Sequence, residues 1–249
     1  MRRVLLVAVM VAPFLYMVAT GLAAGPEALT ALPFGRFVLT SAVVAVTVVV
    51  GQVLTSATAA YAFARLRFAG RDRLFLAYLS ALTVPTIVLV VPRFLFVDAL
   101  GWAEGYRGLI STELVSVTGI FLLRQFFRTL PRDLEDAARL EGAGEWTIFW
   151  RVVVPQARPA LATLAVLAFA EQWRSFLWPL VVAQSGAPQV VEVGMANLWG
   201  MYPLSGPDQI AVAALAMLPM VVLYVVAQKY FVRWITASSL SFSSLQSSN

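Results

Sequence analysis

The chain has 249 residues, of which 60% are hydrophobic and 12% charged, with a net charge of +5 and neither histidine nor cysteine. A soluble domain carries about twice that fraction of charged residues, so the composition excludes a soluble globular protein. The absence of His and Cys excludes a Ser-His-Asp or Cys-His nucleophile, the usual zinc and haem sites and any disulfide bond. We therefore expect a membrane protein with no catalytic residues, metal ligands or cofactor of its own.

Six apolar stretches are long enough to cross a bilayer, because a spanning helix needs about 20 mainly apolar residues. They cover residues 4–23, 37–63, 74–97, 108–127, 159–184 and 209–231. The sequence thus predicts an all-α membrane protein with six transmembrane helices in one domain over residues 1–249. The first stretch also fits a cleavable secretory signal, since two arginines precede it and small residues follow it. We favour a retained span, because the run is long for a signal and retention keeps an even number of spans.

Basic residues gather on one side of the predicted spans. Fourteen of the 18 lie before the first span, after the second, after the fourth and after the sixth: Arg2, Arg3, Arg65, Arg67, Arg71, Arg73, Arg124, Arg128, Arg132, Arg139, Arg151, Arg158, Lys229 and Arg233. The opposite loops contain the acidic residues Glu27, Asp98, Glu104, Glu192 and Asp208. The positive-inside rule therefore places both termini in the cytoplasm. Since the basic charge marks topology, we expect no nucleic-acid partner.

Small residues mark one face of the second predicted span. Ser56, Ala60 and Ala64 lie four residues apart, which favours close packing against another helix. Prolines lie within several spans, including Pro85 and Pro179, where neighbouring helices can satisfy the carbonyl groups that proline frees. Kinked helices of this kind suit a transporter but do not distinguish it from a membrane-embedded enzyme.

The longest hydrophilic stretch, residues 124–158, predicts two short helices along the inner membrane surface. Pro131 suits a first helical position. Acidic residues follow in the first turn, where the helix dipole favours negative charge: Asp133, Glu135 and Asp136. Gly142 supplies a break, and a second helix rich in aromatic residues ends at Pro155.

This loop resembles that of the permease subunits of ATP-binding-cassette importers, which reads Glu-Ala-Ala, three residues, Gly, nine residues, Ile, one residue, Leu-Pro. The matching residues stand at the same offsets here: Asp136-Ala137-Ala138, Gly142, Val152, Val154 and Pro155. Further blocks resemble the carbohydrate branch, in particular the second permease of the maltose-type importer: residues 59–68, 121–127, 159–163 and 176–179.

The resemblance implies a six-span subunit of the cell (inner) membrane, in contact with lipid, that imports a sugar or oligosaccharide. Its implied partners are a second permease in a heterodimer, two ATP-binding-cassette ATPase subunits and an extracytoplasmic solute-binding protein. ATP hydrolysis is expected on the ATPase subunits, because this chain has no Gly-rich Lys-Ser/Thr phosphate loop. An autonomous secondary transporter is the alternative, although no internal repeat or carboxylate relay is evident.

The resemblance also assigns residues 131–155 to a cytoplasmic coupling loop, whose first helix would sit in a groove of the ATPase. The expected coupling residues are Glu135, Asp136, Ala137, Ala138 and Gly142. Asp136 replaces the family's glutamate, which would weaken or redirect an ion pair with the ATPase. The alternative for this segment is an amphipathic helix that rests on lipid headgroups.

Charged residues within the fifth predicted span indicate a candidate solute pathway. Glu171, Arg174, Ser175 and Trp178 lie at i, i+3, i+4 and i+7, so one continuous helix would present them on one face. Charge within the bilayer is costly, so we expect Glu171 to pair with Arg174. Polar groups here, together with Trp173 or Trp178, could bind a sugar; an internal ion pair or an interface to the second permease is the alternative.

The same segment departs from its relatives, which commonly read Trp-Asn-Asp or Trp-Asn-Glu before Phe. This chain reads Trp173-Arg174-Ser175-Phe176, so the charge is reversed and an anionic or unusually substituted sugar becomes a candidate solute. The outer loop, about 185–208, contains aromatic residues that could reach a binding protein or form an interfacial belt, which we prefer. Residues 236–249 form a polar tail that we expect to be flexible.

Overall fold

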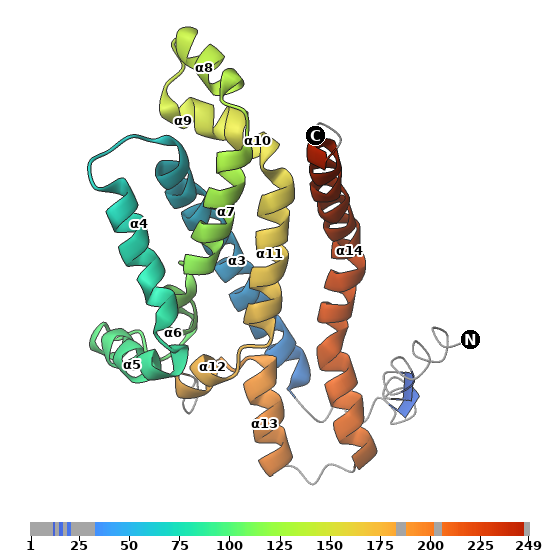
Figure 1. Ribbon diagram of the computed structural model, residues 1–249. Helices are drawn as coiled ribbons and strands as arrows, with labels where there is room; N and C mark the ends of the chain where they lie inside the picture. The colour runs from blue at the N-terminus through green and yellow to red at the C-terminus, as the bar shows by residue number, and fades with distance from the viewer. Residues whose placement is uncertain are drawn as a thin grey trace.

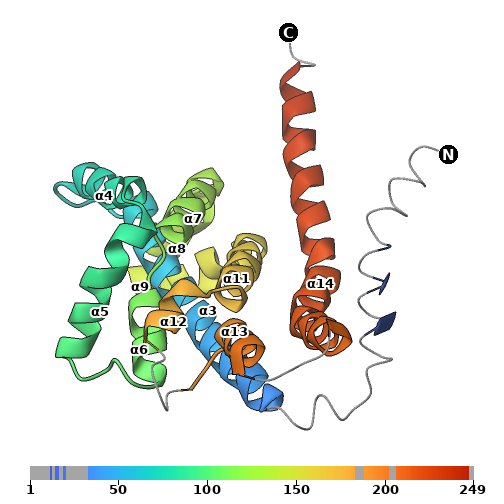
Figure 2. The ribbon, with the colours of Figure 1, turned by 90° about the horizontal axis from the view of Figure 1, so that it is seen from below.

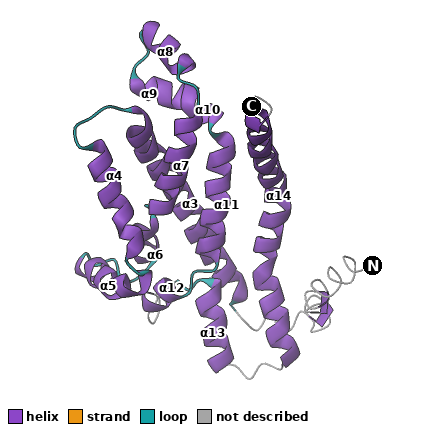
Figure 3. Ribbon diagram, in the orientation of Figure 1, coloured by secondary structure: helices purple, strands orange, loops and turns teal. Residues whose placement is uncertain are grey.

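The computed structural model describes residues 33–182, 188–201 and 206–246, together with Ala12, Leu15, Tyr16, Ala19 and Thr20. This described part contains helices and loops and no strand (Figure 3). The predicted all-helical class is therefore confirmed for it. Most of the predicted first span lies outside the described residues. The prediction that it is a retained span and not a cleavable signal therefore concerns residues outside the described part.

The helices follow one another with short connections. In chain order they are α3 (Phe34–Arg65), α4 (Arg71–Ser80), α5 (Val90–Ala99), α6 (Tyr106–Ile110), α7 (Val117–Thr129), α8 (Asp133–Leu140), α9 (Glu145–Ile148), α10 (Val154–Gln156), α11 (Arg158–Trp173), α12 (Leu177–Val182), α13 (Val191–Met201) and α14 (Gly206–Gln246). Short 3-10 turns occupy Ala81–Thr83, Thr86–Leu89 and Ser111–Glu113, and a π-helical turn occupies Phe149–Val153.

Three helical segments are long and apolar enough to cross a membrane: Phe34–Arg65, Tyr106–Thr129 and Gln209–Gln228. Two further pairs pass the same test only when their halves are taken together. Arg71–Thr83 and Thr86–Ala99 meet at 95°, and Glu145–Gln156 and Arg158–Trp173 meet at 78°. The described residues thus hold three candidate spans, or five if each bent pair is one span.

The third predicted span, residues 74–97, is not the continuous helix that its hydropathy suggests. Val84 has an extended backbone, with φ −85° and ψ 119°, immediately before Pro85. Proline disfavours the helical conformation for the residue that precedes it, so the helical segment Arg71–Thr83 stops here and the segment Thr86–Ala99 leaves in a new direction. Residues 74–97 can therefore cross a membrane only if the segments Arg71–Thr83 and Thr86–Ala99 form one bent span.

The fifth predicted span, residues 159–184, also ends early. Helix α11 stops at Trp173, and a separate short helix, α12, begins at Leu177. Pro179 has no N–H for the carbonyl of Ser175, and in a continuous helix its ring would clash with that carbonyl. Pro179 therefore disfavours a continuous helix through Ser175, although Pro219 is accommodated inside α14.

Helix α3 is the central element of the bundle. It packs against α7 and α11, and against α13 near its N-terminal end, where Phe37 lies close to Gly194. Figures 1 and 2 show α3 running diagonally through the bundle, while α14 lies beside α11. In Figure 1, α8 and α9 project from one end of the bundle, and α12 and α13 lie at the other.

The predicted small-residue face of α3 is confirmed. Ser56 and Ala60 are fully buried and Ala64 is nearly so. They allow α7 to approach closely, because a Cβ added at Gly119 of α7 would lie 2.6 Å from the Ser56 Oγ and 3.0 Å from the Leu164 Cδ1. Glycine at this crossing therefore sets how near α3, α7 and α11 can come to one another.

Replacing Gly119 by leucine is expected to lower the free energy of unfolding by about 1–3 kcal/mol, because the added side chain overfills a packed interface. Thermal unfolding of the purified protein in detergent measures the effect. Gly35→Leu is the matched control, since a Cβ there meets nothing within 4 Å. Equal melting temperatures for the two variants would contradict the packing argument.

Candidate functional site

The loop between α7 and α11 folds as the helix, turn and second helix that the sequence predicts. Helix α8 has three acidic residues in its first turn. Gly142 then adopts a left-handed conformation, with φ 85°, which side chains with a Cβ rarely adopt. The turn is closed by two backbone hydrogen bonds, in which Gly142 N donates to Arg139 O and Ala143 N donates to Ala138 O. The loop is a defined structure rather than a linker.

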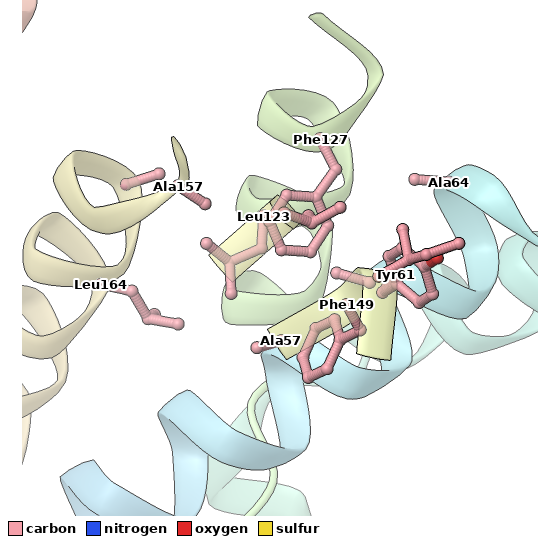
Figure 4. Packing of buried hydrophobic residues seen from close by; sticks show 12 residues of the cluster. Ala57, Tyr61, Ala64, Leu123, Phe127, Phe149, Ala157 and Leu164 are labelled. Carbon is pink, nitrogen blue, oxygen red and sulfur yellow. The ribbon is translucent and has the colours of Figure 1, made fainter. Parts of the chain in front are cut away.

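Aromatic and aliphatic side chains anchor the loop to the bundle. Phe149, whose exposed fraction is 1%, packs with Tyr61 of α3, and their ring centroids are 5.1 Å apart. Figure 4 shows this cluster with side chains from α3, α7 and α11 around it. Burying a large apolar side chain contributes about 1.5–3 kcal/mol, so the second half of the loop moves together with the helix ends.

A buried ion pair joins the first half of the loop to α3. Arg65 Nε lies 2.9 Å from Glu135 Oε1, and the two side chains are only 3% and 2% exposed. Arg65 also donates from Nη2 to the Leu130 carbonyl at 2.7 Å. The carboxylate of Glu135 therefore faces into the protein, so α8 is fixed to the end of α3.

Arg139 links three acidic side chains in the same loop. Its Nε and Nη1 donate to Glu145 Oε1 and Asp136 Oδ1, each at 2.8 Å, and its Nη2 lies 3.5 Å from Glu135 Oε2. Tyr61 donates to the other oxygen of Glu145 at 2.6 Å. The hydrogen bond from Arg139 lowers the pKa of Glu145, and the same bond raises the pKa of Arg139. Both groups are therefore charged at neutral pH.

Replacing Arg139 by glutamine is expected to loosen the loop without unfolding the bundle. Its charge-assisted hydrogen bonds contribute about 1 kcal/mol each near the surface, so amide hydrogen exchange over residues 133–148 should become at least about tenfold faster. Mass spectrometry of exchanged peptides measures this. Arg151→Gln, at an exposed arginine on the π-helical turn, is the control, and equal exchange in both variants would argue against the network.

The five predicted coupling residues are distributed between the surface and the interior. Asp136 and Ala137 are exposed, Ala138 is half-buried, and a Cβ at Gly142 would meet nothing within 4 Å. Glu135 is the one that turns inward. Sequence reasoning missed Arg65 as its partner, because 70 residues separate the two.

Sequence reasoning also missed the apolar part of the loop surface. Leu140 is 91% exposed at the end of α8, and Trp146 is 66% exposed on α9. We call Asp136, Leu140 and Trp146 the loop face. Exposed apolar side chains rimmed by charge are typical of a protein interface, and a leucine that ends a polar helix was the available signal in the sequence.

The candidate solute-pathway residues do not lie on one helical face, so the predicted shared face is wrong, whereas their role in a solute pathway stays a prediction. Because α11 ends at Trp173, the spacing of Glu171, Arg174, Ser175 and Trp178 no longer describes one helix. The predicted pair of Glu171 with Arg174 is absent from the ion pairs of the described residues. Arg174 is exposed and donates from Nε to the Ala170 carbonyl at 3.1 Å.

The two tryptophans of that segment are buried. Trp173 donates from Nε1 to the Ala216 carbonyl of α14 at 3.1 Å and stacks on Phe169. Trp178 donates from Nε1 to the Gly108 carbonyl at 3.2 Å. Their indole groups thus join α11 and α12 to neighbouring helices, whereas Glu171 and Arg174 remain on the surface and Ser175 is half-buried.

An ion pair between the third and fourth predicted spans was also missed. Arg93 of α5 contacts Glu113, donates to the Thr112 hydroxyl at 2.6 Å and lies over the Trp178 ring, with 4.2 Å to its centroid. Gln52 of α3 donates to the Glu113 carbonyl at 2.8 Å. The sequence contained a signal for this pair, since Arg93 and Glu113 are charged residues within two predicted spans.

Comparison with known proteins gives consistent matches over most of the chain. Residues 52–237 match the family described as "Binding-protein-dependent transport system inner membrane component". The sn-glycerol-3-phosphate transport system permease protein UgpE of Yersinia pestis bv. Antiqua is 34% identical over 211 residues, covering 83% of this chain and 74% of that protein. The arabinooligosaccharides transport system permease protein AraQ of Halalkalibacterium halodurans is 32% identical, covering 79% and 71% respectively.

A solved structure shares the fold. It is a crystal structure of a bacterial ABC transporter involved in the import of the acidic polysaccharide alginate, with a TM-score of 0.74 and 22% sequence identity over 86% of this chain and 79% of that one. The predicted resemblance is thereby confirmed: the chain belongs to the binding-protein-dependent transport system inner membrane components, the permease subunits of ATP-binding-cassette importers.

Proposed function

We propose that the chain imports a sugar or a sugar derivative as one half of a heterodimeric translocation pathway, with residues 131–155 as its coupling loop. Its partners are a second permease, two ATPase subunits and an extracytoplasmic solute-binding protein, and both termini lie in the cytoplasm. Family membership decides against an autonomous secondary transporter. The observation that carries the coupling role is the loop itself, which is exposed on one side and fixed to the bundle on the other.

Coupling follows from the way the loop is attached. Closure of the ATPase dimer on ATP would displace the loop face, and alternating access requires that this displacement reaches the transmembrane helices. Two rigid connections are available: the buried pair of Arg65 with Glu135, which ends on α3, and the cluster around Phe149, which involves α3, α7 and α11. A displaced α8 would therefore tilt helices rather than bend the loop.

Copurification tests this function. The tagged chain, extracted from native membranes in mild detergent, should bring with it an ATPase and a second permease, both identifiable by mass spectrometry. Changing Asp136 to lysine and Gly142 to valine together should remove the ATPase and retain the permease. Recovery of the chain alone, active in transport without ATP, would refute the proposal.

The exposed positive charge of Arg174 favours a negatively charged solute. The similar proteins named above act on sn-glycerol-3-phosphate and arabinooligosaccharides, which are both polyhydroxylated, and the first is anionic. An exposed guanidinium at the break between α11 and α12 matches phosphate or carboxylate geometry. We therefore propose a sugar or polyol derivative that carries a negative charge.

Replacing Arg174 by glutamine is expected to reduce uptake of an anionic solute by about tenfold or more at low concentration, because a hydrogen bond to a charged group contributes about 1.5–3 kcal/mol. Uptake of labelled sn-glycerol-3-phosphate and of a neutral arabinooligosaccharide into proteoliposomes with the complete transporter measures the contrast. Ser175→Ala is the neighbouring control. Unchanged transport by Arg174→Glu would exclude Arg174 from solute selection.

A further inference from the structure

A basic cavity of about 590 Å³ opens where α3 and α7 end and α4 begins, on the side of the predicted coupling loop. Five of its lining residues are arginines, against a single acid, Asp72: Arg65, Arg71, Arg124, Arg128 and Arg132. Its remaining walls are Phe63, Ala64, Phe75 and Leu76. The cavity therefore combines excess positive charge with an apolar wall.

The arginines at the base of the cavity are held in fixed positions. Arg124 lies over the Phe75 ring at 3.8 Å, donates from Nε to the Phe63 carbonyl at 3.2 Å and has its Nη2 3.4 Å from Asp72 Oδ1. Arg71 donates to Asp72 from Nε and Nη2, each at 3.2 Å. Asp72 thus forms ion pairs with both Arg71 and Arg124, and Arg65 is paired with Glu135.

Two further arginines of the cavity form no ion pair of this kind. Arg128 and Arg132 are exposed, and neither takes part in the ion pairs found among the described residues. The N-terminus of α4 adds to the field, since Gly70 at its N-cap has φ 79° and no side chain to accept from the first-turn amides. A neighbouring cavity shares Arg71 and Asp72 and extends the basic surface.

An apolar surface starts at the same cavity and runs along the following helices. Leu76 lines the cavity and is exposed. Leu82 and, beyond the break, Ile87 are also exposed. In Figure 1, α4 leads away from the end that carries α8 and α9. A ligand with a phosphate at one end and hydrocarbon at the other matches this arrangement, whereas an inorganic anion would make no use of the apolar side.

We propose that this cavity binds the headgroup phosphate of an anionic phospholipid of the cytoplasmic leaflet, with the acyl chains along the exposed face of α4. Basic pockets between transmembrane helices on the cytoplasmic side are suited to such headgroups. The inference rests on the proposed orientation, in which α8 lies in the cytoplasm. The site shares no residue with the loop face, although Arg132 is the N-cap of α8.

Lipid titration of the complete transporter tests the site. The complex is purified in detergent, depleted of lipid and titrated with phosphatidylglycerol, and bound lipid is counted by native mass spectrometry. Arg128→Gln with Arg132→Gln should weaken binding by about 30-fold, since each arginine near the surface contributes about 1 kcal/mol. Arg151→Gln with Arg158→Gln removes the same charge from exposed positions outside the cavity and should leave binding unchanged.

Further arms separate the alternatives. Arg128→Lys with Arg132→Lys should retain most of the binding, which shows that loss in the glutamine variant is not misfolding. Equal losses in the two glutamine pairs would overturn the site in favour of a general surface charge, and competition by inorganic phosphate as strong as by lipid would make it a free-anion site. A photocrosslink from position 128 to the ATPase would also overturn it. ATPase copurification is scored separately, so failure of the lipid site leaves the proposed function testable.

Discussion

Replacing Glu135 by alanine is expected to reduce ATP-driven uptake by the assembled transporter by about tenfold or more. The change removes one partner of a buried ion pair whose side chains are 2% and 3% exposed, and leaves the charge of Arg65 without compensation. Breaking such a pair by removing one partner costs about 3–5 kcal/mol. Because the pair fixes α8 to the end of α3, only the cluster around Phe149 would then pass a displacement of the loop to the helices.

Uptake and ATP hydrolysis, measured together in proteoliposomes with the binding protein, separate uncoupling from loss of assembly. Uncoupling leaves ATPase copurification intact and lowers the solute transported for each ATP hydrolysed. The exchanged pair Arg65→Glu with Glu135→Arg restores the attraction and should recover part of the uptake. Normal uptake by Glu135→Ala alone would show that the pair is not part of the connection.

Replacing Leu140 by aspartate is expected to weaken assembly of the chain with its ATPase subunits. Leu140 is 91% exposed at the end of α8, beside Gly142, where the chain turns. If it fills a groove of the ATPase, a charge in its place would weaken docking by at least about 2 kcal/mol, as at an interface hot spot. The free chain should lose little stability, because the side chain contacts so little of it.

Quantitative copurification measures the docking loss, and the melting temperature of the free chain measures folding. Leu100→Asp is the matched control, since Leu100 is also exposed but lies at the end of α5, away from the loop face. Loss of the ATPase from both variants, or from neither, would contradict the assignment of the loop face.

The long helices and the buried face of α3 were predictable from the sequence. Long apolar runs marked α3 and α14, and the spacing of small residues identified the buried face of α3 at Ser56 and Ala60. The helix, turn and second helix of the predicted coupling loop were predictable because the acidic first turn of α8 and Gly142 act locally, through the helix dipole and backbone geometry. The prediction that Pro131 stands at the first helical position was wrong, since α8 begins at Asp133 with Arg132 as its N-cap.

The breaks and the distant pairs were not predictable in this way. Hydropathy counts the residues around Pro85 and Pro179 as part of a span, although the helical path is interrupted at Val84, before Pro85, and again at residues 174–176, before Pro179. The pairing of Arg65 with Glu135, and of Arg93 with Glu113, depends on how helices far apart in the chain are packed. The predicted shared face of Glu171 and Arg174 was wrong because its spacing assumed a continuous helix, whereas α11 ends at Trp173.

The most direct test of the central claim is a crosslink from the loop face. The chain contains no cysteine, so Leu140→Cys introduces the only thiol of this subunit, which can be labelled with a maleimide that carries a photoreactive group. Illumination of the native complex should attach the chain to an ATPase subunit, and added ATP should change the yield. Attachment only to lipid or to a second copy of this chain, with the same products from Leu100→Cys, would contradict the coupling role.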